Sequence, residues 1–204
     1  MSAPTRRPRC EHCALPLPTC VCALVTHVPN EVEVLVLQHP AEAIEAKGSA
    51  RLLRLSLARC RVVVGEVFGA AELLAMLDGD VSGSALLYPA DTLGGREAPC
   101  SWASPARPRR LVLLDGTWRK STGMLRANAL LQSLPRWPLR PAAPARYGAL
   151  RKAPRAWQLS TLEAACTALA DIEGAPTRYA PLLDAFDRFV AAGAARAGRT
   201  PAPQ

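Results

Sequence analysis

The sequence lacks any uninterrupted apolar run of the roughly 18 to 20 residues that a membrane-spanning helix requires. Its first residues, MSAPTRRPRCEHC, carry cations but no apolar segment behind them, so they do not resemble a secretory signal peptide. We therefore expect a cytoplasmic protein. No internal repeat is found, and half of the residues are hydrophobic, which argues against a disordered chain. A length of 204 residues suits one α/β domain with a small appendage.

Acidic residues are almost missing from one long segment. The whole chain holds 25 Lys and Arg against 17 Asp and Glu, for a formal net charge of +8. Between Ser101 and Ser160 the sequence places twelve of those cations and one carboxylate, Asp115. This distribution favours an anionic partner, with nucleic acid as the first choice. An arginine-rich face also occurs in chains that are simply biased toward Ala, Arg and Pro, and that reading stays open.

Hydrophobic patterning predicts strands that alternate with helices. Such alternation is typical of an α/β fold with a largely parallel sheet. We expect a head over 1–30, a main domain over 31–194 and a loose tail over 195–204. The predicted strands span 32–40, 59–67, 84–91 and 109–116, with one short strand somewhere in 135–154. The predicted helices span 41–60 with an interruption at Gly48, then 70–79, 117–134 with a weak point at Gly123, 160–174 and 178–196.

Ligands of parallel sheets bind at the carboxyl ends of the strands. In this chain the segments QHPAE, YPAD and DGTW each follow a predicted strand, so we expect them to lie near one another.

The head contains a cysteine cluster with the spacing C-x2-C-x6-C-x-C, formed by Cys10, Cys13, Cys20 and Cys22. Four thiolates this close in sequence predict one tetrahedral zinc site in a segment too short for its own core. Such a closed site leaves no position for catalysis. Two disulfides are the alternative, which a cytosolic location disfavours. His12 and His27 are substitute ligands, while Cys60, Cys100 and Cys166 are expected to be small buried hydrophobes.

Asp115 ends the apolar run RLVLLD, so its side chain is expected at a strand terminus. It could cap the following helix, but Thr117 could do so equally well, which would leave Asp115 available for chemistry. Trp118 beside cations suits either a core position or stacking on a base. From composition alone the functional and structural readings are about equal.

The segment DGTW, with its D-x-T-W pattern, resembles the DTW-domain family of tRNA-uridine aminocarboxypropyltransferases. Further motifs resemble that family in the same order: the cysteine cluster, LQHPAE, LLYP, ALRKAP and LSTLEA. They span Cys10 to about Glu173, which is most of the chain. One departure lies in KGSARLL, where the family often carries an Asn-Thr pair and where only Ser49 offers a hydroxyl.

The resemblance implies S-adenosylmethionine as the donor of a 3-amino-3-carboxypropyl group and N3 of a tRNA uridine as the acceptor. It also implies 5′-methylthioadenosine as the by-product, a structural zinc ion, and a SPOUT-like α/β fold that could be knotted. The residues that it points to are Asp115, Thr117 and Trp118 for catalysis, and His39, Tyr88, Pro89, Asp115, Ser160, Thr161 and Glu163 for the donor. Arg119, Lys120, Arg151, Lys152 and Arg155 are assigned to tRNA.

The chemistry leaves the role of Asp115 open. It could act as the base that removes the N3 proton, or as a counter-ion for the donor's ammonium group. Ser160 and Glu163 also fit a helix-capping box, which explains their spacing without any ligand. The alternatives to the transferase are a methyltransferase of similar fold, a non-catalytic zinc-containing RNA-binding module and a zinc-stabilised scaffold without an RNA role.

Overall fold

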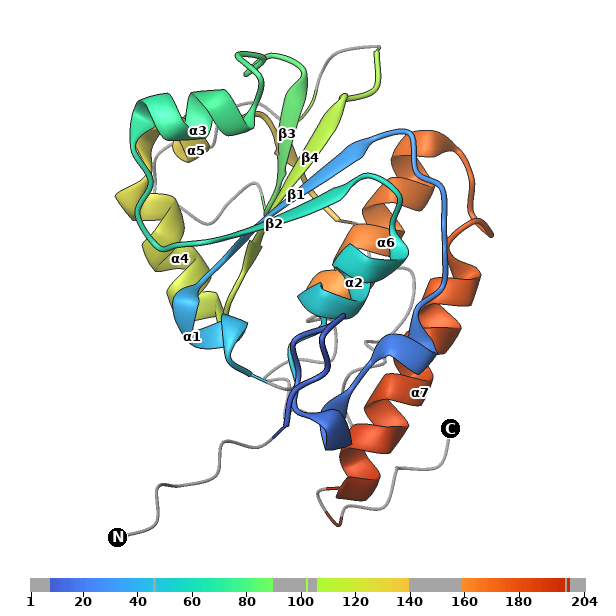
Figure 1. The fold of residues 1–204 in the computed structure, drawn as a ribbon. Helices are drawn as coiled ribbons and strands as arrows, with labels where there is room; N and C mark the ends of the chain where they lie inside the picture. The colour runs from blue at the N-terminus through green and yellow to red at the C-terminus, as the bar shows by residue number, and fades with distance from the viewer. Residues whose placement is uncertain are drawn as a thin grey trace, which may run out of the picture.

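The protein forms one twisted sheet with helices on both faces. The structure, a computed structural model, describes residues 8–45, 47–89, 102, 106–139, 159–196 and 198. The five strands have the order β2-β1-β4-β3-β5, and every neighbouring pair is parallel, which confirms the predicted sheet (Figure 1). The strands are β1 (Glu33–Gln38), β2 (Cys60–Val64), β3 (Ser84–Leu87), β4 (Arg110–Asp115) and β5 (Arg136–Trp137).

The helices cover the sheet in two groups. Figure 1 shows α3, α4 and α5 on one face, and α2, α6 and α7 on the other. Their bounds are α1 (Pro40–Ala43), α2 (Ala50–Ser56), α3 (Ala70–Met76), α4 (Trp118–Ala127), α5 (Ala129–Ser133), α6 (Thr161–Glu173) and α7 (Ala180–Arg196). No helix within the described ranges is both long and apolar enough to cross a bilayer.

The central strands are apolar on both sides because both sides are covered. In β1, Val34 and Val36 belong to the core beneath α2, α6 and α7, whereas Leu35 and Leu37 belong to the core beneath α3, α4 and α5. All four are fully buried. The sequence therefore showed an unbroken apolar run rather than an alternating one.

The sequence predicted one continuous helix over 117–134, and this prediction is wrong. The segment 117–134 forms two helices that meet at Asn128, not a single helix weakened at Gly123. The Asn128 side-chain amide donates to the carbonyls of Met124 and Glu66, and its oxygen accepts from the backbone N–H of Phe68. These contacts tie the break to the β2–α3 connection. Gly123 lies inside α4, where an added Cβ would meet nothing within 4 Å.

The cysteine-rich head packs against the main body. Cys13, Leu15 and Val21 are buried in the core shared by α6 and α7. Two short 3-10 helices, η1 (Leu17–Thr19) and η2 (Cys22–Leu24), shape the head. The guanidinium of Arg51, on α2, donates to the carbonyl oxygens of Cys13 and Ala43, so it links the head to the end of α1.

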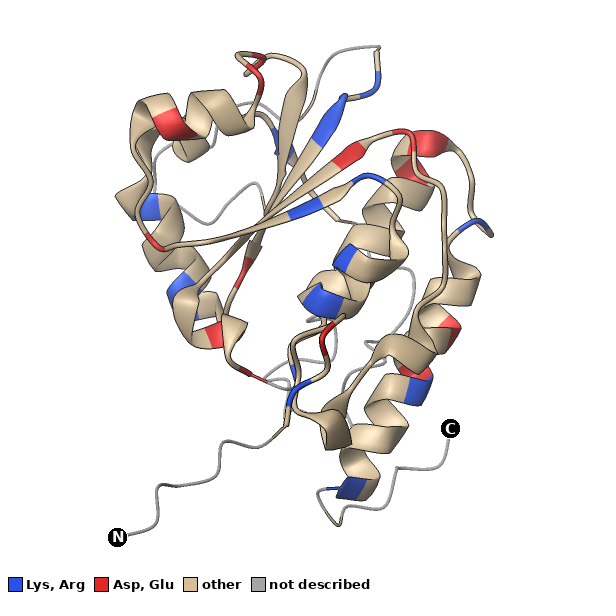
Figure 2. Cartoon of the chain, in the orientation of Figure 1, with Lys and Arg blue, Asp and Glu red and all other residues tan. Residues whose placement is uncertain are grey.

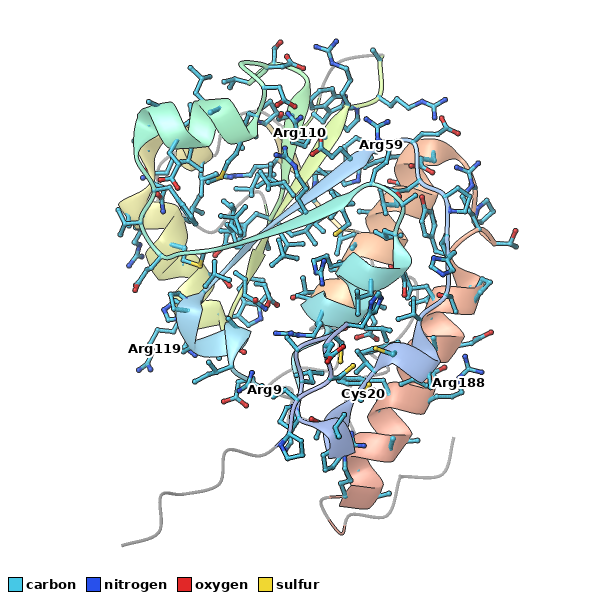
Figure 3. The ribbon with its side chains drawn as sticks, in the orientation of Figure 1. Arg9, Cys20, Arg59, Arg110, Arg119 and Arg188 are labelled. Atoms are coloured by element: carbon cyan, nitrogen blue, oxygen red, sulfur yellow. The ribbon has the colours of Figure 1, made fainter. Side chains whose placement is uncertain are left out.

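The strand register brings the predicted segments to one edge. Gln38, the last residue of β1, pairs with Asp115, the last residue of β4, and β3 lies on the other side of β4. The segments QHPAE, DGTW and the start of YPAD thus follow three adjacent parallel strands. Figure 3 shows Arg110, the first residue of β4, and Arg119, in the first turn of α4, at opposite ends of the sheet.

Candidate functional site

Asp115 is the centre of the site, and its carboxylate is held by two different elements. The side-chain amide of Gln38 donates to Oδ2 at 2.7 Å, and the hydroxyl of Thr161, the first residue of α6, donates to Oδ1. Asp115 is only 7% exposed. Each carboxylate oxygen therefore has a fixed donor, which sets the plane of the group.

The backbone around Asp115 is tied to the β1–α1 turn. The N–H of His39 donates to the Asp115 carbonyl at 2.9 Å. The His39 ring caps α1 by accepting from the Ala41 N–H through Nδ1, and Nε2 lies 3.5 Å from a carboxylate oxygen of Glu66. His39 is thus at the predicted edge, where it acts as a cap. Gly116 permits α4 to start at once, because a Cβ there would come 3.1 Å from the Cβ of Lys120.

Of the two possible caps, Asp115 and Thr117, it is Thr117 that caps α4, by accepting a hydrogen bond from the Lys120 N–H. This leaves the Asp115 side chain outside the cap. Trp118 is 42% exposed, and its ring meets Tyr88 edge-on with 5.9 Å between centroids. The Tyr88 hydroxyl shares a 3.0 Å hydrogen bond with Thr122. Pro89 follows Tyr88 at the end of β3. An exposed indole anchored at one edge can stack on a planar ring.

The N-terminus of α6 lies on the side of Asp115 where Thr161 contacts it. Ser160 and Glu163 make a capping box: the Ser160 hydroxyl accepts from the Glu163 N–H, and the Glu163 carboxylate accepts from the Ser160 N–H at 2.9 Å. The hydroxyl of Ser49 accepts from the Leu162 N–H at 3.3 Å. Ser49 thus helps fix the helix start that carries Thr161, although its segment departs from the family pattern.

The predicted RNA-binding cations have different environments. Lys120 makes an ion pair with Glu42 at 2.8 Å, and the Glu42 side chain is 6% exposed, so Lys120 fastens α1 to α4. Arg119 and Arg126 are exposed on the same helix, and no ion pair of theirs is found within the described residues. Arg151, Lys152 and Arg155 lie outside the described residues.

Other cations of the basic segment form ion pairs with carboxylates of the fold. Arg107 pairs with Glu31, Arg109 with Asp80, and Arg110 with Glu33 and Asp78. Figure 2 shows Lys and Arg positions on α4, on α2 and at the start of β4. The positive segment of the sequence is therefore divided among several parts of the fold.

The four head cysteines come together, as their spacing predicted, in a group that could hold a metal ion. Their sulfur atoms all lie within 4.8 Å of one another, with Cys10 and Cys22 at 3.6 Å and Cys13 and Cys20 at 3.7 Å. A zinc ion bonded to four sulfurs at about 2.3 Å would place the sulfurs about 3.8 Å apart. Backbone hydrogen bonds from Cys13 and His12 lower the pKa of Cys10 to about 6. The donor set fits a closed tetrahedral site.

The remaining cysteines differ. Cys166 is buried, as predicted, and Cys60 is half-buried in strand β2. Burial raises the pKa of the Cys60 thiol to about 12, so it is protonated and unreactive at neutral pH. Cys100 lies outside the described residues.

Sequence reasoning missed two residues near the site. Gln38 stood within a quoted motif but received no role, although its place at the end of a strand was a usable signal. Arg136, at the start of β5, is 1% exposed, and its guanidinium carbon lies 5.7 Å from the centre of the Tyr88 ring. Nothing in the sequence separates Arg136 from its exposed neighbours in the basic segment.

Comparison with known proteins gives a consistent result. The DTW domain family matches residues 7–193 of the chain. A Drosophila melanogaster protein named tRNA-uridine aminocarboxypropyltransferase 2 is 34% identical over 182 residues, which is 85% of this chain and 70% of that protein. Proteins of the same name from Mus musculus and Macaca fascicularis are 31% and 29% identical, and the match spans 57% of each. No solved structure matches significantly.

Proposed function

The chain belongs to the DTW-domain family, and on that premise we propose that it transfers the 3-amino-3-carboxypropyl group of S-adenosylmethionine to N3 of a tRNA uridine. The by-product is 5′-methylthioadenosine. The observation that carries the proposal is the buried Asp115 carboxylate, oriented by Gln38 and Thr161 beside the exposed ring of Trp118.

The residues at this edge fit the donor. S-adenosylmethionine supplies an electrophilic methylene next to its sulfonium, and its arm also carries an ammonium and a carboxylate. Asp115 offers the negative charge that the ammonium or the sulfonium needs. The Gln38 amide and the Thr161 hydroxyl orient that carboxylate at the N-terminal end of α6. An oriented carboxylate at this edge can serve as the counter-ion of the donor's ammonium group or as the base for the acceptor.

The acceptor requires a different set of groups. N3 of uridine is a weak nucleophile until its proton leaves, so a base must stand within hydrogen-bond reach of it. The His39 ring lies at the same edge but is not that base, because Nδ1 accepts from the Ala41 N–H and Nε2 therefore carries the ring proton toward Glu66. In this scheme the Asp115 carboxylate is the group at this edge that takes the proton. The bond from the methylene to sulfur breaks as the bond to N3 forms. The N3 proton passes to the base.

The tRNA is held by exposed groups near the edge. Trp118 provides an exposed aromatic surface for an extruded base, and Arg119 and Arg126 lie on the same helix for contacts with phosphates. Arg151, Lys152 and Arg155 stay predictions for the same role. The zinc ion at the four cysteines is structural in this scheme, because all four coordination positions would be filled.

We extend the proposal to the fold type and location. A SPOUT-like arrangement, with a knot in the C-terminal half, is supported by the family relationship and agrees with the parallel five-stranded sheet. The cytoplasmic location also stays a prediction.

The test is to incubate the zinc-loaded protein with unmodified tRNA and S-adenosylmethionine and to identify the nucleoside by-product by mass spectrometry. Methylthioadenosine is expected from the wild type, and its amount should fall sharply with Asp115→Ala. S-adenosylhomocysteine would indicate a methyltransferase instead. Neither product, with tRNA binding intact in both proteins, would indicate the RNA-binding module.

A further inference from the structure

Arg136 is a buried cation for which the described residues provide no carboxylate partner. Its side chain is almost fully enclosed, at 1% exposure, on the sheet face covered by α4 and α5. Nη1 donates to the Leu131 carbonyl at 3.2 Å, whereas Nη2, among the described residues, has no hydrogen-bond partner. Burial lowers the pKa of Arg136 below its usual value. Within the part of the chain that the structure describes, the Nη2 nitrogen and its N–H groups are thus left unsatisfied.

The other buried arginine of the described sheet, Arg110, has carboxylate partners. Arg110, whose side chain is 8% exposed, contacts Glu33 at 2.7 Å, Asp78, and the Leu77 carbonyl at 2.6 Å. Burying a charge without a counter-ion is costly, and an apolar residue of similar size is usually more stable there. Arg110 meets that requirement through its carboxylates. Arg136 does not, so its presence calls for a partner that is not part of the protein's core.

The position of Arg136 connects it to the candidate active site. Its guanidinium lies against the ring of Tyr88, and the same ring meets Trp118 edge-on. Trp118 follows Asp115 by three residues, at the start of α4. A series of direct side-chain contacts therefore runs from the unsatisfied N–H group to the edge where the donor is proposed to bind.

We propose that Arg136 binds the carboxylate of the donor's aminocarboxypropyl arm. This inference rests on the proposed function and adds a specificity-determining residue to it. The guanidinium presents paired N–H groups that match a carboxylate. Asp115 and Arg136 then bind different groups of the donor: Asp115 attracts its cationic groups, and Arg136 attracts the carboxylate of its arm. Together they orient the methylene rather than the methyl group toward the acceptor.

A carboxylate on a slender arm suits this location better than an RNA phosphate does. The guanidinium is almost fully enclosed, against the Tyr88 ring and the Leu131 carbonyl, and a slender carboxylate arm needs a smaller opening to reach it than a sugar–phosphate backbone does. Binding of the arm therefore requires the Tyr88 ring, which is 6% exposed, packs on Trp118 and is bonded to Thr122 through its hydroxyl, to move aside.

The test compares two ligands that differ only in the carboxylate. Calorimetry measures the affinity of the zinc-loaded full-length protein for S-adenosylmethionine and for its decarboxylated analogue. Hydrogen bonds to charged groups predict that the wild type prefers S-adenosylmethionine by about 10- to 100-fold. Arg136→Met should lose this preference while its affinity for the analogue stays within about twofold. Arg136→Lys, which keeps the charge, should retain part of the preference.

Arg110→Met is the matched control because it removes another buried arginine at the far end of the sheet. It should lower the melting temperature and leave the ligand preference unchanged. Arg136→Met should melt at the wild-type temperature or above it, since it removes an unpaired buried charge.

Three results would overturn the inference. The first is an Arg136→Met protein that keeps the preference, and the second is one that binds both ligands equally more weakly, as a packing defect would. The third is weaker tRNA binding with the preference intact, which would make the anion a phosphate. A wild type that transfers the arm but shows no preference contradicts only this inference. A wild type that binds neither ligand and forms no product contradicts the proposed function as well.

Discussion

Removing the Gln38 amide should slow transfer without unfolding the protein. Gln38→Leu deletes a 2.7 Å hydrogen bond to a carboxylate that is 7% exposed, while Thr161 still holds the other oxygen. A hydrogen bond to a charged group contributes about 1.5–3 kcal/mol, which corresponds to a roughly 10- to 150-fold lower single-turnover rate if it serves orientation. By-product formation under saturating donor and tRNA measures that rate.

The effect must pass through Asp115, and a double-mutant cycle tests this. In an Asp115→Asn background, Gln38→Leu should lower the transfer rate only slightly further, because the oriented negative charge is already absent. Asn30→Leu is the control: Asn30 is also a buried amide, and it donates to the Val32 and Arg59 carbonyls at the far end of β1. The reasoning is refuted if Asn30→Leu slows the reaction as much as Gln38→Leu does, or if the two losses at Gln38 and Asp115 are additive.

Three further predictions concern separate features. Lys120→Met should lower stability by about 2 kcal/mol in chemical denaturation because it removes the ion pair with the buried Glu42 carboxylate. Arg119→Gln should instead leave stability unchanged and reduce the salt dependence of tRNA binding by about one unit of slope. A zinc chelator should lower the melting temperature and loosen the head that packs on α7, as seen by limited proteolysis; unchanged melting would count against a structural metal. Burial, with a hydrogen bond to Glu173, raises the pKa of Tyr179, so its proton is kept in the folded state but lost from the unfolded chain above about pH 10. The contribution of Tyr179 to stability should therefore be constant below that pH and fall above it, and the alkaline loss of stability should be smaller in Tyr179→Phe.

Much of the fold could be predicted because its signals are local. Apolar runs that end at Pro, Gly or Asp marked the main strands, and the Ser160–Glu163 spacing marked the start of α6. Parallel strands with ligand segments at their carboxyl ends followed from the alternation of elements. The break at Asn128 could not be predicted, since it depends on contacts with Glu66 and Phe68 about 60 residues away.

The candidate site was predictable in outline but not in its contacts. Asp115 could be placed at a strand end from the sequence, whereas the choice of Thr117 rather than Asp115 as the helix cap needed the structure. Its partners Gln38 and Thr161 come from β1 and α6, and only strand order and helix packing decide that they meet. The same limit applies to cations. Lys120 and Arg119 are adjacent in sequence, yet one is paired with a buried carboxylate and the other is exposed.

The most direct measurement of the central claim is the chemical position of the transferred group. The protein should be supplied with unmodified tRNA and S-adenosylmethionine labelled with ¹³C in the aminocarboxypropyl arm, and the digested nucleosides analysed by NMR and mass spectrometry. We predict a labelled methylene bonded to N3 of uridine, which is lost with Asp115→Ala. Label that appears on another atom of the tRNA, or a nucleoside pool without any label when donor and tRNA both bind, would contradict the account.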